Sequence, residues 1–465
     1  MLGIDAFHDP LTTCLPTEIA SRILTFCVDT DQEIERRIPL ALSAVSRRWR
    51  DIAQSTPALW TSIRLQFKSA PIQSSCEEML RHWILHSSQR QLSIHLSIDS
   101  CDRKDAFAMR VYRTIIEILN AHSYRWGKPS LRIPVHLLNL FRGEIHGAPD
   151  LHWLSIGTTS KKDDEDGQIP KFDLGGPLPA PRTVFFSPCR LSRIRIDWMN
   201  VTDVHMLVPY IGECLALFAT APRLRECKLV YVRDDDDASG YPSTPIIHHH
   251  LLKLEVARTR LNSISPFFDH LCCPSLESLR YDCGSQPLDP LQSFLVRSSA
   301  PLKFLPVEET SYFNHEINLT NLLWAIPSLE ELEIFCSYLY DEFWELLATY
   351  SEGNPAEQFL PMLMSVSLGG QSGVDREHDL QKICKALEVR TSCDRADRGL
   401  GVLKRLNWHM NIEHYLDEET LQLFERLIED GLDFELTNQE FGGSDMIKYS
   451  RAYYDEMRDQ SANAL

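Results

Sequence analysis

A short apolar pattern, Leu-x-x-Leu-x-apolar, recurs through this chain and limits its fold more than any other feature. Between Leu224 and Leu329 its copies start 25 to 27 residues apart, and outside that stretch they are spaced more widely. A period of roughly 20 to 29 residues is typical of repeats that combine one strand with a helix. The copies begin at Leu151, Leu191, Leu224, Leu251, Leu276, Leu302, Leu329, Leu363 and Leu403.

Each copy of the pattern predicts a strand with one buried face. Positions 1, 4 and 6 face inward, as in Leu276, Leu279 and Tyr281, while positions 3 and 5 face outward. Helical spacing follows some copies, most clearly at Asp417–Asp430. One strand and one helix cannot bury both apolar faces alone, so neighbouring copies have to stack. We therefore expect an α/β fold over residues 70–440, an irregular leucine-rich-repeat solenoid with a parallel sheet.

The segment from Leu15 to Trp60 predicts a separate bundle of three short helices. Ile19, Ile23 and Phe26 form an apolar stripe after Leu15-Pro16, which opens the first helix. A later helix over Val45–Ala53 carries a second stripe. A bundle of about 45 residues buries too little surface to be stable alone, and stripes this wide exceed what its own core can absorb. The surplus predicts a protein partner.

The same residues resemble the F-box motif, most closely its fungal form. The likeness rests on Leu15-Pro16-x-Glu18-Ile19, on Val45-Ser46-Arg47-Arg48-Trp49-Arg50-Asp51-Ile52-Ala53 and on Thr56-Pro57-x-Leu59-Trp60. It implies docking on a Skp-type adaptor that joins the chain to a cullin–RING ubiquitin ligase. Ile23 and Trp60 are expected to be mainly core. The residues that would lie in or beneath the adaptor contact are Leu15, Pro16, Ile19, Leu24, Val45, Trp49 and Ile52.

The outward positions of successive strands predict a second surface, which could hold a protein substrate. Basic residues predominate in the earlier copies and acidic residues in the later ones, so a partner of complementary charge order would be steered into register. The alternative is that these are ordinary solvated strand residues. The candidates are Trp153, Arg193, Arg195, Lys228, Lys253, Arg280, Phe304, Glu331, Glu333 and Phe335.

Composition and motifs exclude several other classes. Lys and Arg total 47 against 65 Asp and Glu, and a net charge of −18 disfavours nucleic acid as a partner. No stretch approaches a membrane span, and the 13 cysteines contain no Cys-x-x-Cys pair, so reduced thiols in the cytoplasm or nucleus are expected. The acidic segments Lys161–Asp166 and Asp234–Asp237 read as loops, and His248–His250 as a loop edge rather than a metal site. No catalytic or phosphate-binding motif is present, so we expect neither an enzyme nor a cofactor.

These observations predict four parts: an N-terminal extension at 1–14, an F-box-like domain at 15–65, the repeats at 70–440 and a polar tail at 441–465. The function they favour is substrate recognition for a Skp/cullin/F-box ubiquitin ligase, in which the repeats hold a protein substrate. The alternative is a scaffold or protein-binding module that uses the same repeats without a ligase.

Overall fold

A computed structural model of the chain divides into two compact units, Met1–Met206 and Leu207–Leu465, and each is described by itself. The predicted extension at 1–14, the segment Lys161–Asp166, and Asp236 and Asp237 lie outside the described residues. The described residues are 15–27, 38–68, 75–143, 147–159, 170–235, 241–259, 264–282, 287–308, 319–335, 341–349, 358–372, 377–411, 415–438 and 444–463.

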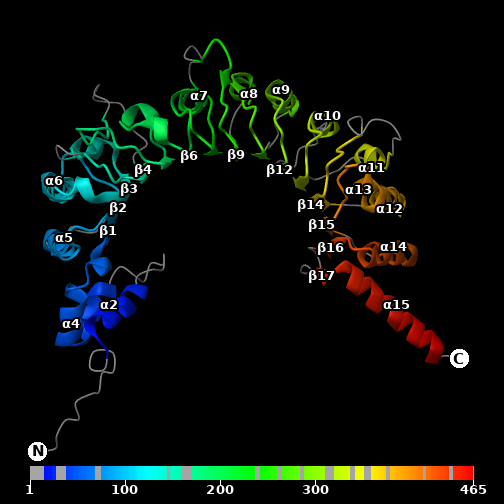
Figure 1. The fold of residues 1–465 in the computed structure, drawn as a ribbon, viewed down its shortest axis with the longest axis horizontal. Coiled ribbons are helices and arrows are strands. Elements are labelled where there is room, and N and C mark those ends of the chain that lie inside the picture. The colour runs from blue at the N-terminus through cyan, green and yellow to red at the C-terminus, as the bar shows by residue number, and fades with distance from the viewer. Residues whose placement is uncertain are drawn as a thin grey trace, which may run out of the picture. The chain divides into compact units, whose positions relative to one another are not determined.

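The first unit opens with short helices, drawn in blue in Figure 1. They are α2 (Thr17–Phe26), α3 (Ile38–Val45), α4 (Arg47–Gln54) and the 3-10 turn η2 (Pro57–Trp60). Pro16 precedes α2, and its carbonyl accepts hydrogen bonds from the Ile19 and Ala20 amides at 3.0 Å, so the helix begins where the sequence predicts.

The sheet of the first unit follows these helices. Its strands run parallel and pair in chain order, with α5 (Ser75–His86) and α6 (Ala106–Asn120) on one side. The 3-10 turns η3 (Ser123–Arg125), η4 (Val135–Leu140), η5 (Leu191–Arg193) and η6 (Trp198–Asn200) lie in the connections. The strands are β1 (Ser62–Phe67), β2 (Leu92–Ile98), β3 (Trp126–Ile133), β4 (Trp153–Thr158), β5 (Thr183–Ser187) and β6 (Asp203–Leu207).

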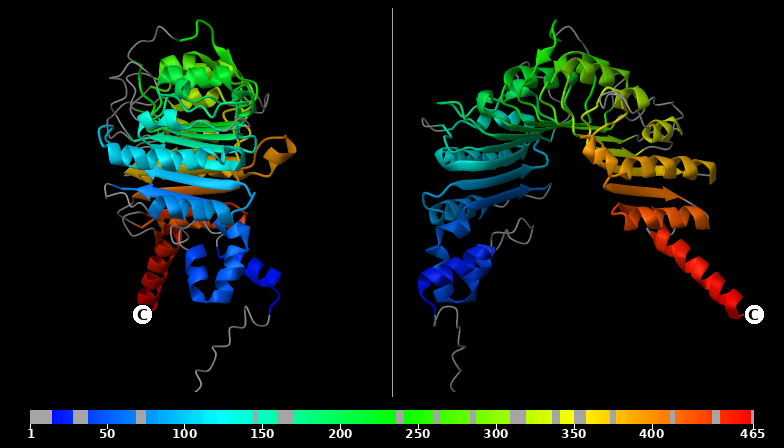
Figure 2. Two further views of the ribbon diagram at one scale, coloured as in Figure 1. Left: turned by 90° about the vertical axis from the view of Figure 1, so that its left-hand side faces the viewer. Right: turned by 45° about the vertical axis from the view of Figure 1, so that its right-hand side comes forward.

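Strands and helices alternate through the second unit, and the helices lie on one side of its sheet (Figure 1 and Figure 2). The strands are parallel and in chain order until β17, which is antiparallel to β16. They are β7 (Glu226–Val230), β9 (Lys253–Ala257), β11 (Ser278–Asp282), β12 (Phe304–Glu308), β13 (Glu331–Phe335), β14 (Ser365–Ser372), β15 (Arg405–Asn411), β16 (Asp433–Asn438) and β17 (Ser444–Asp445). A small separate sheet pairs β8 (Ile246–Ile247) with β10 (Leu271–Cys272).

The helices of the second unit vary in length from a single turn to several turns, and the longest closes the chain. They are α7 (Ile211–Thr220), α8 (Ser265–Asp269), α9 (Asp289–Ser298), α10 (Leu319–Trp324), α11 (Asp341–Ala348), α12 (Glu377–Thr391), α13 (Asp394–Asp397), α14 (Glu418–Glu429) and α15 (Met446–Asn463).

The inward positions of the repeated pattern form the core of the second unit. Leu276, Leu279 and Tyr281 have no exposed surface. Leu276 precedes β11, and Leu279 and Tyr281 lie within it, as the pattern predicts. Each copy from Leu224 onward is followed by a strand that starts two residues after its first leucine, and so is the copy at Leu151. The parallel sheet is therefore confirmed, whereas its interpretation as a leucine-rich-repeat solenoid stays a prediction.

The copy at Leu191 is the exception, and the strand predicted there is wrong. Leu191–Arg193 forms the 3-10 turn η5, and the strand of this region is β5, which begins at Thr183. Ile194 and Ile196 are nevertheless only 5% exposed. The pattern therefore identified buried residues correctly but not their backbone conformation. The strand of this region is β5 instead, and its inward residues are Val184 and Phe186.

Most of the polar tail predicted at 441–465 forms the helix α15. The helix is held at its start, where Met446 and Ser450 are fully buried and the Ser450 hydroxyl accepts a hydrogen bond from the Leu416 amide at 3.1 Å. Farther along, the Tyr454 hydroxyl donates to the Leu416 carbonyl at 3.1 Å. These contacts give the polar segment enough anchorage to form a helix against α14.

Trp60 fastens the N-terminal helices to the rest of the first unit. Its indole is fully buried, and its Nε1 donates to the Ala53 carbonyl at 2.8 Å. The ring meets Trp83 of α5 edge to face, with ring centroids 5.0 Å apart. Within the N-terminal helices, Thr56 joins the end of α4 to α2, because its Oγ1 lies 2.9 Å from the Ser21 hydroxyl. The expectation that Trp60 is core is confirmed.

Replacing Trp60 with alanine should destabilise the first unit by about 3–5 kcal/mol, because it empties a buried site and removes the bond to Ala53. Urea unfolding followed by circular dichroism measures the change. Leu85→Ala is the control, since Leu85 lies on α5 with a side chain that is 73% exposed, and it should cost less than about 0.5 kcal/mol. Equal losses in the two variants would contradict the anchoring role of Trp60.

Candidate functional site

Helix α2 has two apolar faces, of which its own bundle covers one. On the covered face, Ala20 and Leu24 are at most 1% exposed. Ile19, Ile23 and Phe26 are spaced at i, i+4 and i+7 on another face, and they are 45%, 37% and 66% exposed. The expectation that Ile23 is mainly core is therefore wrong. A helix that leaves such a stripe uncovered has surface for a further protein to bury.

The predicted helix over Val45–Ala53 is interrupted at Ser46. Ser46 has extended backbone, with φ −155° and ψ 171°, and its side chain accepts a hydrogen bond from the Trp49 amide at 3.2 Å. This cap ends α3 at Val45 and starts α4 at Arg47. Val45 consequently leaves the buried stripe and is 61% exposed, whereas Ile52 and Ala53 remain buried.

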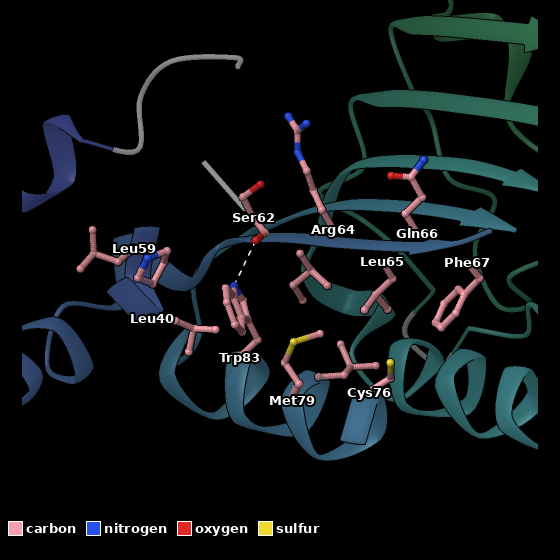
Figure 3. Close-up of a pocket in the computed structure, with 13 residues that line it drawn as sticks. Leu40, Leu59, Ser62, Arg64, Leu65, Gln66, Phe67, Cys76, Met79 and Trp83 are labelled. Atoms are coloured by element: carbon pink, nitrogen blue, oxygen red, sulfur yellow. Dashed lines mark hydrogen bonds between the residues drawn. The ribbon is translucent and has the colours of Figure 1, made fainter. Parts of the chain in front are cut away.

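A hollow of about 250 Å³ lies between α3, η2, β1 and α5 (Figure 3). Leu65 and Phe67 of β1 point into it toward α5, while Arg64 and Gln66 point away. At one end the Trp83 indole donates to the Ser62 carbonyl at 3.1 Å. Leu40 lines the hollow from α3 and is 39% exposed. Exposed apolar surface therefore extends from α3 to the edge of the sheet.

Comparison with protein-family models accounts for this part of the chain. Residues 12–66 match the model described as F-box-like. The chain carries an F-box-like domain. Among curated proteins, the comparison finds no match to the chain.

The predicted adaptor-contact residues fall into two groups within the F-box-like domain. Leu24 and Ile52 are 1% and 5% exposed, so they support the surface from beneath and cannot be reached by a partner. The other five retain exposed surface: Pro16, Ile19 and Val45 are exposed, and Leu15 and Trp49 are partly buried.

Besides Ile23, which was expected to be core, Phe26 and Leu40 are exposed residues missing from that predicted set. Phe26 completes the stripe of α2 with Ile19 and Ile23, and its i+7 spacing was the signal that pointed to it. Leu40 had no comparable signal, because its exposure depends on how α3 lies against β1 and α5. The F-box-like domain therefore presents more apolar surface than the resemblance alone assigned.

The second predicted surface is the strand face of the second unit, and its charges are largely paired across neighbouring strands. Lys228 lies 2.7 Å from Glu255, and Lys253 lies 2.7 Å from Glu226. These pairs form because the register places β7 and β9 side chains opposite one another. These two lysines lie on the outward face as predicted, and each is paired with a carboxylate of the neighbouring strand.

Arg280 of β11 is bound by two glutamates farther along the same face. Its Nη1 lies 2.6 Å from Glu308, and its Nη2 lies 3.5 Å from Glu333. Burial raises the pKa of the Glu333 carboxyl, Arg280 opposes that shift, and Glu331 and Glu308 add to it. The basic and acidic residues of the predicted surface thus meet at Arg280.

The aromatic candidates lie beside this charged group. Phe304 and Glu331 are paired residues of β12 and β13, and Phe335 ends β13. A Cβ at Gly369 would come within 2.6 Å of the Phe335 ring, so the glycine of β14 makes room for that ring. Phe304 and Phe335 are partly buried and Glu331 is exposed. Glu331, Glu333, Phe304 and Phe335 therefore share one face with Arg280.

The candidates from the earlier copies, Arg193, Arg195 and Trp153, belong to the first unit. Arg193 is only 2% exposed, so its predicted role on an open surface is wrong; it lies in η5 and not in a strand. Arg195 is exposed but lies 2.8 Å from Asp173. Trp153 starts β4 and is partly buried.

The described residues lack two other kinds of site. They contain no helix long and apolar enough to cross a bilayer, and no group of three His, Cys, Asp or Glu side chains placed to hold a metal ion. His248, the first residue of the histidine triplet, is buried, with its Nε2 3.0 Å from the Ala221 carbonyl. Burial lowers the pKa of His248, as expected for a core residue.

Replacing Arg280 with methionine should destabilise the protein by about 1 kcal/mol at neutral pH, because Glu308 and Glu333 lose their shared cation while staying partly exposed. The loss should shrink as the pH falls toward 5. A carboxyl whose folded-state pKa is raised takes up a proton more readily in the folded chain, so acid favours the folded form. Urea unfolding at several pH values measures the loss.

Arg405→Met is the matched control, since Arg405 lies 3.1 Å from an Asp433 carboxylate that is 70% exposed. It should cost less, with little dependence on pH. A pH-independent loss for Arg280→Met would show that its carboxylates are not coupled to folding.

Proposed function

We propose that this chain is a substrate-recognition subunit of a Skp/cullin/F-box ubiquitin ligase. Its F-box-like domain would dock on a Skp-type adaptor, and the strand face of the second unit would hold a protein substrate. The observation that carries the proposal is the uncovered stripe of α2, formed by Ile19, Ile23 and Phe26 within the residues that match the F-box-like model.

The energetics of the stripe favour a protein partner. Its three side chains already bury part of their surface, and covering the remainder would contribute on the order of 1 kcal/mol each. Val45 and Leu40 of α3 add further apolar surface that is 61% and 39% exposed. Leu24 and Ile52, buried beneath, hold α2 and α4 in place, so the surface is formed before the adaptor arrives and little ordering is needed on binding.

The proposed substrate surface would act through its aromatic residues more than through single charges. Lys228, Lys253 and Arg280 are engaged in ion pairs, so a substrate that used them would have to displace a carboxylate. Phe304 and Phe335 are only partly buried and lie beside the exposed Glu331. Aromatic side chains in such positions often dominate interface energies. Ubiquitin transfer itself would be performed by other subunits.

Ile19→Glu should weaken binding to a purified Skp-type adaptor at least tenfold, because it places an unpaired charge in an apolar contact. Biolayer interferometry with the full chain measures the affinity. Glu18→Gln is the control, because residue 18 lies about 100° around the helix from residue 19 and is also exposed. Both variants should unfold at the urea concentration of the wild type. Equal affinity for Ile19→Glu and the wild type would contradict docking through α2.

The same variant separates a ligase subunit from a scaffold. Proteins held by the second unit should co-purify equally with wild-type and Ile19→Glu chains, because the substitution lies outside that unit. With the Ile19→Glu chain in place of the wild type, these proteins should have a lower ubiquitin content and a higher abundance. Quantitative mass spectrometry of the bound proteins measures both. Unchanged ubiquitin content and abundance would favour the scaffold.

A further inference from the structure

The sheet of the first unit has an outward side of its own, away from α5. Arg64 of β1 points to that side (Figure 3). Arg64 pairs with His95 of β2, and His95 pairs with Ser130 of β3, so the register carries the same side across three strands. Lys128 and Arg132 lie two residues before and after Ser130 and therefore share that side, with exposed side chains. Arg64, Lys128 and Arg132 form what we call the basic surface.

The strand register gives the two cations of β3 neutral neighbours. Lys128 pairs with Ser93 of β2, and Arg132 pairs with Ser97 of β2 and with Gly157 of β4. A Cβ at Gly157 would lie 3.8 Å from the Arg132 Cγ, so the arginine stem lies over the glycine. The side chains of the basic surface have no ion pair or hydrogen bond with another described residue. Their charges are therefore available to a partner.

The second unit shows the opposite arrangement, because its outward cations face carboxylates. Lys253 lies 2.7 Å from Glu226, and Arg405 lies 3.1 Å from Asp433. In the first unit all six strands are described, and their outward positions hold one acid, Asp203 of β6. Strand β6 is three strands from β3, roughly 14 Å away at the usual strand spacing. The basic surface is thus a local positive region on a chain of net charge −18.

Small and aromatic side chains border the space between Lys128 and Arg132. Ser130 lies between them on β3, and it pairs with Ser155 of β4. Trp153 precedes Ser155 by two residues, so it lies on β4 beside Lys128, and it is partly buried. Residues i and i+4 of a strand lie about 13 Å apart on one face. The two cations have this spacing, with room over the serines and an aromatic side chain at the border.

We propose that the basic surface binds an extended acidic segment of a partner protein, with carboxylates four residues apart on Lys128 and Arg132. The residue midway between those carboxylates would lie over the serines, where an aromatic side chain can contact Trp153. Arg64 would bind a further carboxylate. A short peptide carries few charges, whereas a nucleic acid carries one at each nucleotide and would be repelled by the rest of the chain. The surface is separate from the α2 stripe and the second unit, so the proposal does not rest on ligase function.

Four labelled probes with the full-length chain test the surface by fluorescence anisotropy at about 150 mM salt. The first is a peptide with the core Glu-Ser-Phe-Ser-Glu between Gly-Ser flanks. The second replaces both Glu with Gln, the third replaces Phe with Ala, and the fourth is a single-stranded DNA of equal length. The first should bind at least tenfold more tightly than the second and the DNA, and several-fold more tightly than the third. Equal binding of the first and second would overturn the proposal. Tighter binding of the DNA would overturn the choice of a protein segment.

A double variant, Lys128→Gln with Arg132→Gln, tests the two cations. It should weaken binding of the first probe at least tenfold, because it removes both contacts to the carboxylates. Both side chains are exposed, so the variant should unfold at the urea concentration of the wild type. Arg405→Gln is the matched control, since it removes a paired cation from an outward strand position, and it should change the affinity less than twofold. Equal affinities of the double variant and the wild type, or equal losses in the double variant and Arg405→Gln, would overturn the proposal.

Two further variants separate this proposal from its alternatives. Ile19→Glu should keep full affinity for the first probe, so a failure of adaptor docking and a failure of the basic surface are distinct results. The acidic run Asp163–Asp166 of the same chain is the competing occupant. Replacing its four residues with serine should leave the affinity for the probe unchanged when the partner is a separate protein. A tenfold gain in affinity would identify the run as the occupant and overturn the proposal.

Discussion

Each parallel strand of this protein has to bury one row of side chains, and this constraint shapes both the core and the open face. In β11 the inward row is Leu279 and Tyr281, which are fully buried. The outward row meets its neighbours in register, as when Lys253 of β9 pairs with Glu226 of β7. Parallel pairing therefore neutralises charges along the strand face. A partner approaching that face meets ion pairs and aromatic rings, so shape and apolar contact should matter more than net charge.

Hydrophobic alternation made the core predictable because it is a local property of each strand. The inward residues of β9, β11 and β13 follow from the sequence pattern alone. The error at Leu191 shows the limit of such reasoning. Ile194 and Ile196 satisfy the pattern and are buried, yet the local backbone is a 3-10 turn followed by an isolated bridge between Phe172 and Ile194. Alternation specifies which residues are inside, whereas hydrogen bonding between distant segments decides whether they form a strand.

The N-terminal surface was predictable as a surplus but not residue by residue. The sequence of α2 contains more apolar positions than a small bundle can cover, and several of these positions are exposed in the fold. Which positions stay uncovered depends on tertiary contacts: Leu24 turns inward, Ile23 does not, and the Ser46 cap moves Val45 to the end of α3. A resemblance to a family can name the segment, but burial of individual residues depends on how α2, α3 and α4 pack.

Buried arginines had no signal in the sequence at all, because nothing local distinguishes them from exposed ones. Arg390 and Arg395 are used where the backbone departs from regular structure. Leu360 has a φ of 45°, and the carbonyls of Leu360 and Pro361 accept hydrogen bonds from these two guanidinium groups before β14 begins. Both charges thus replace the backbone donors that a strand or helix would have supplied.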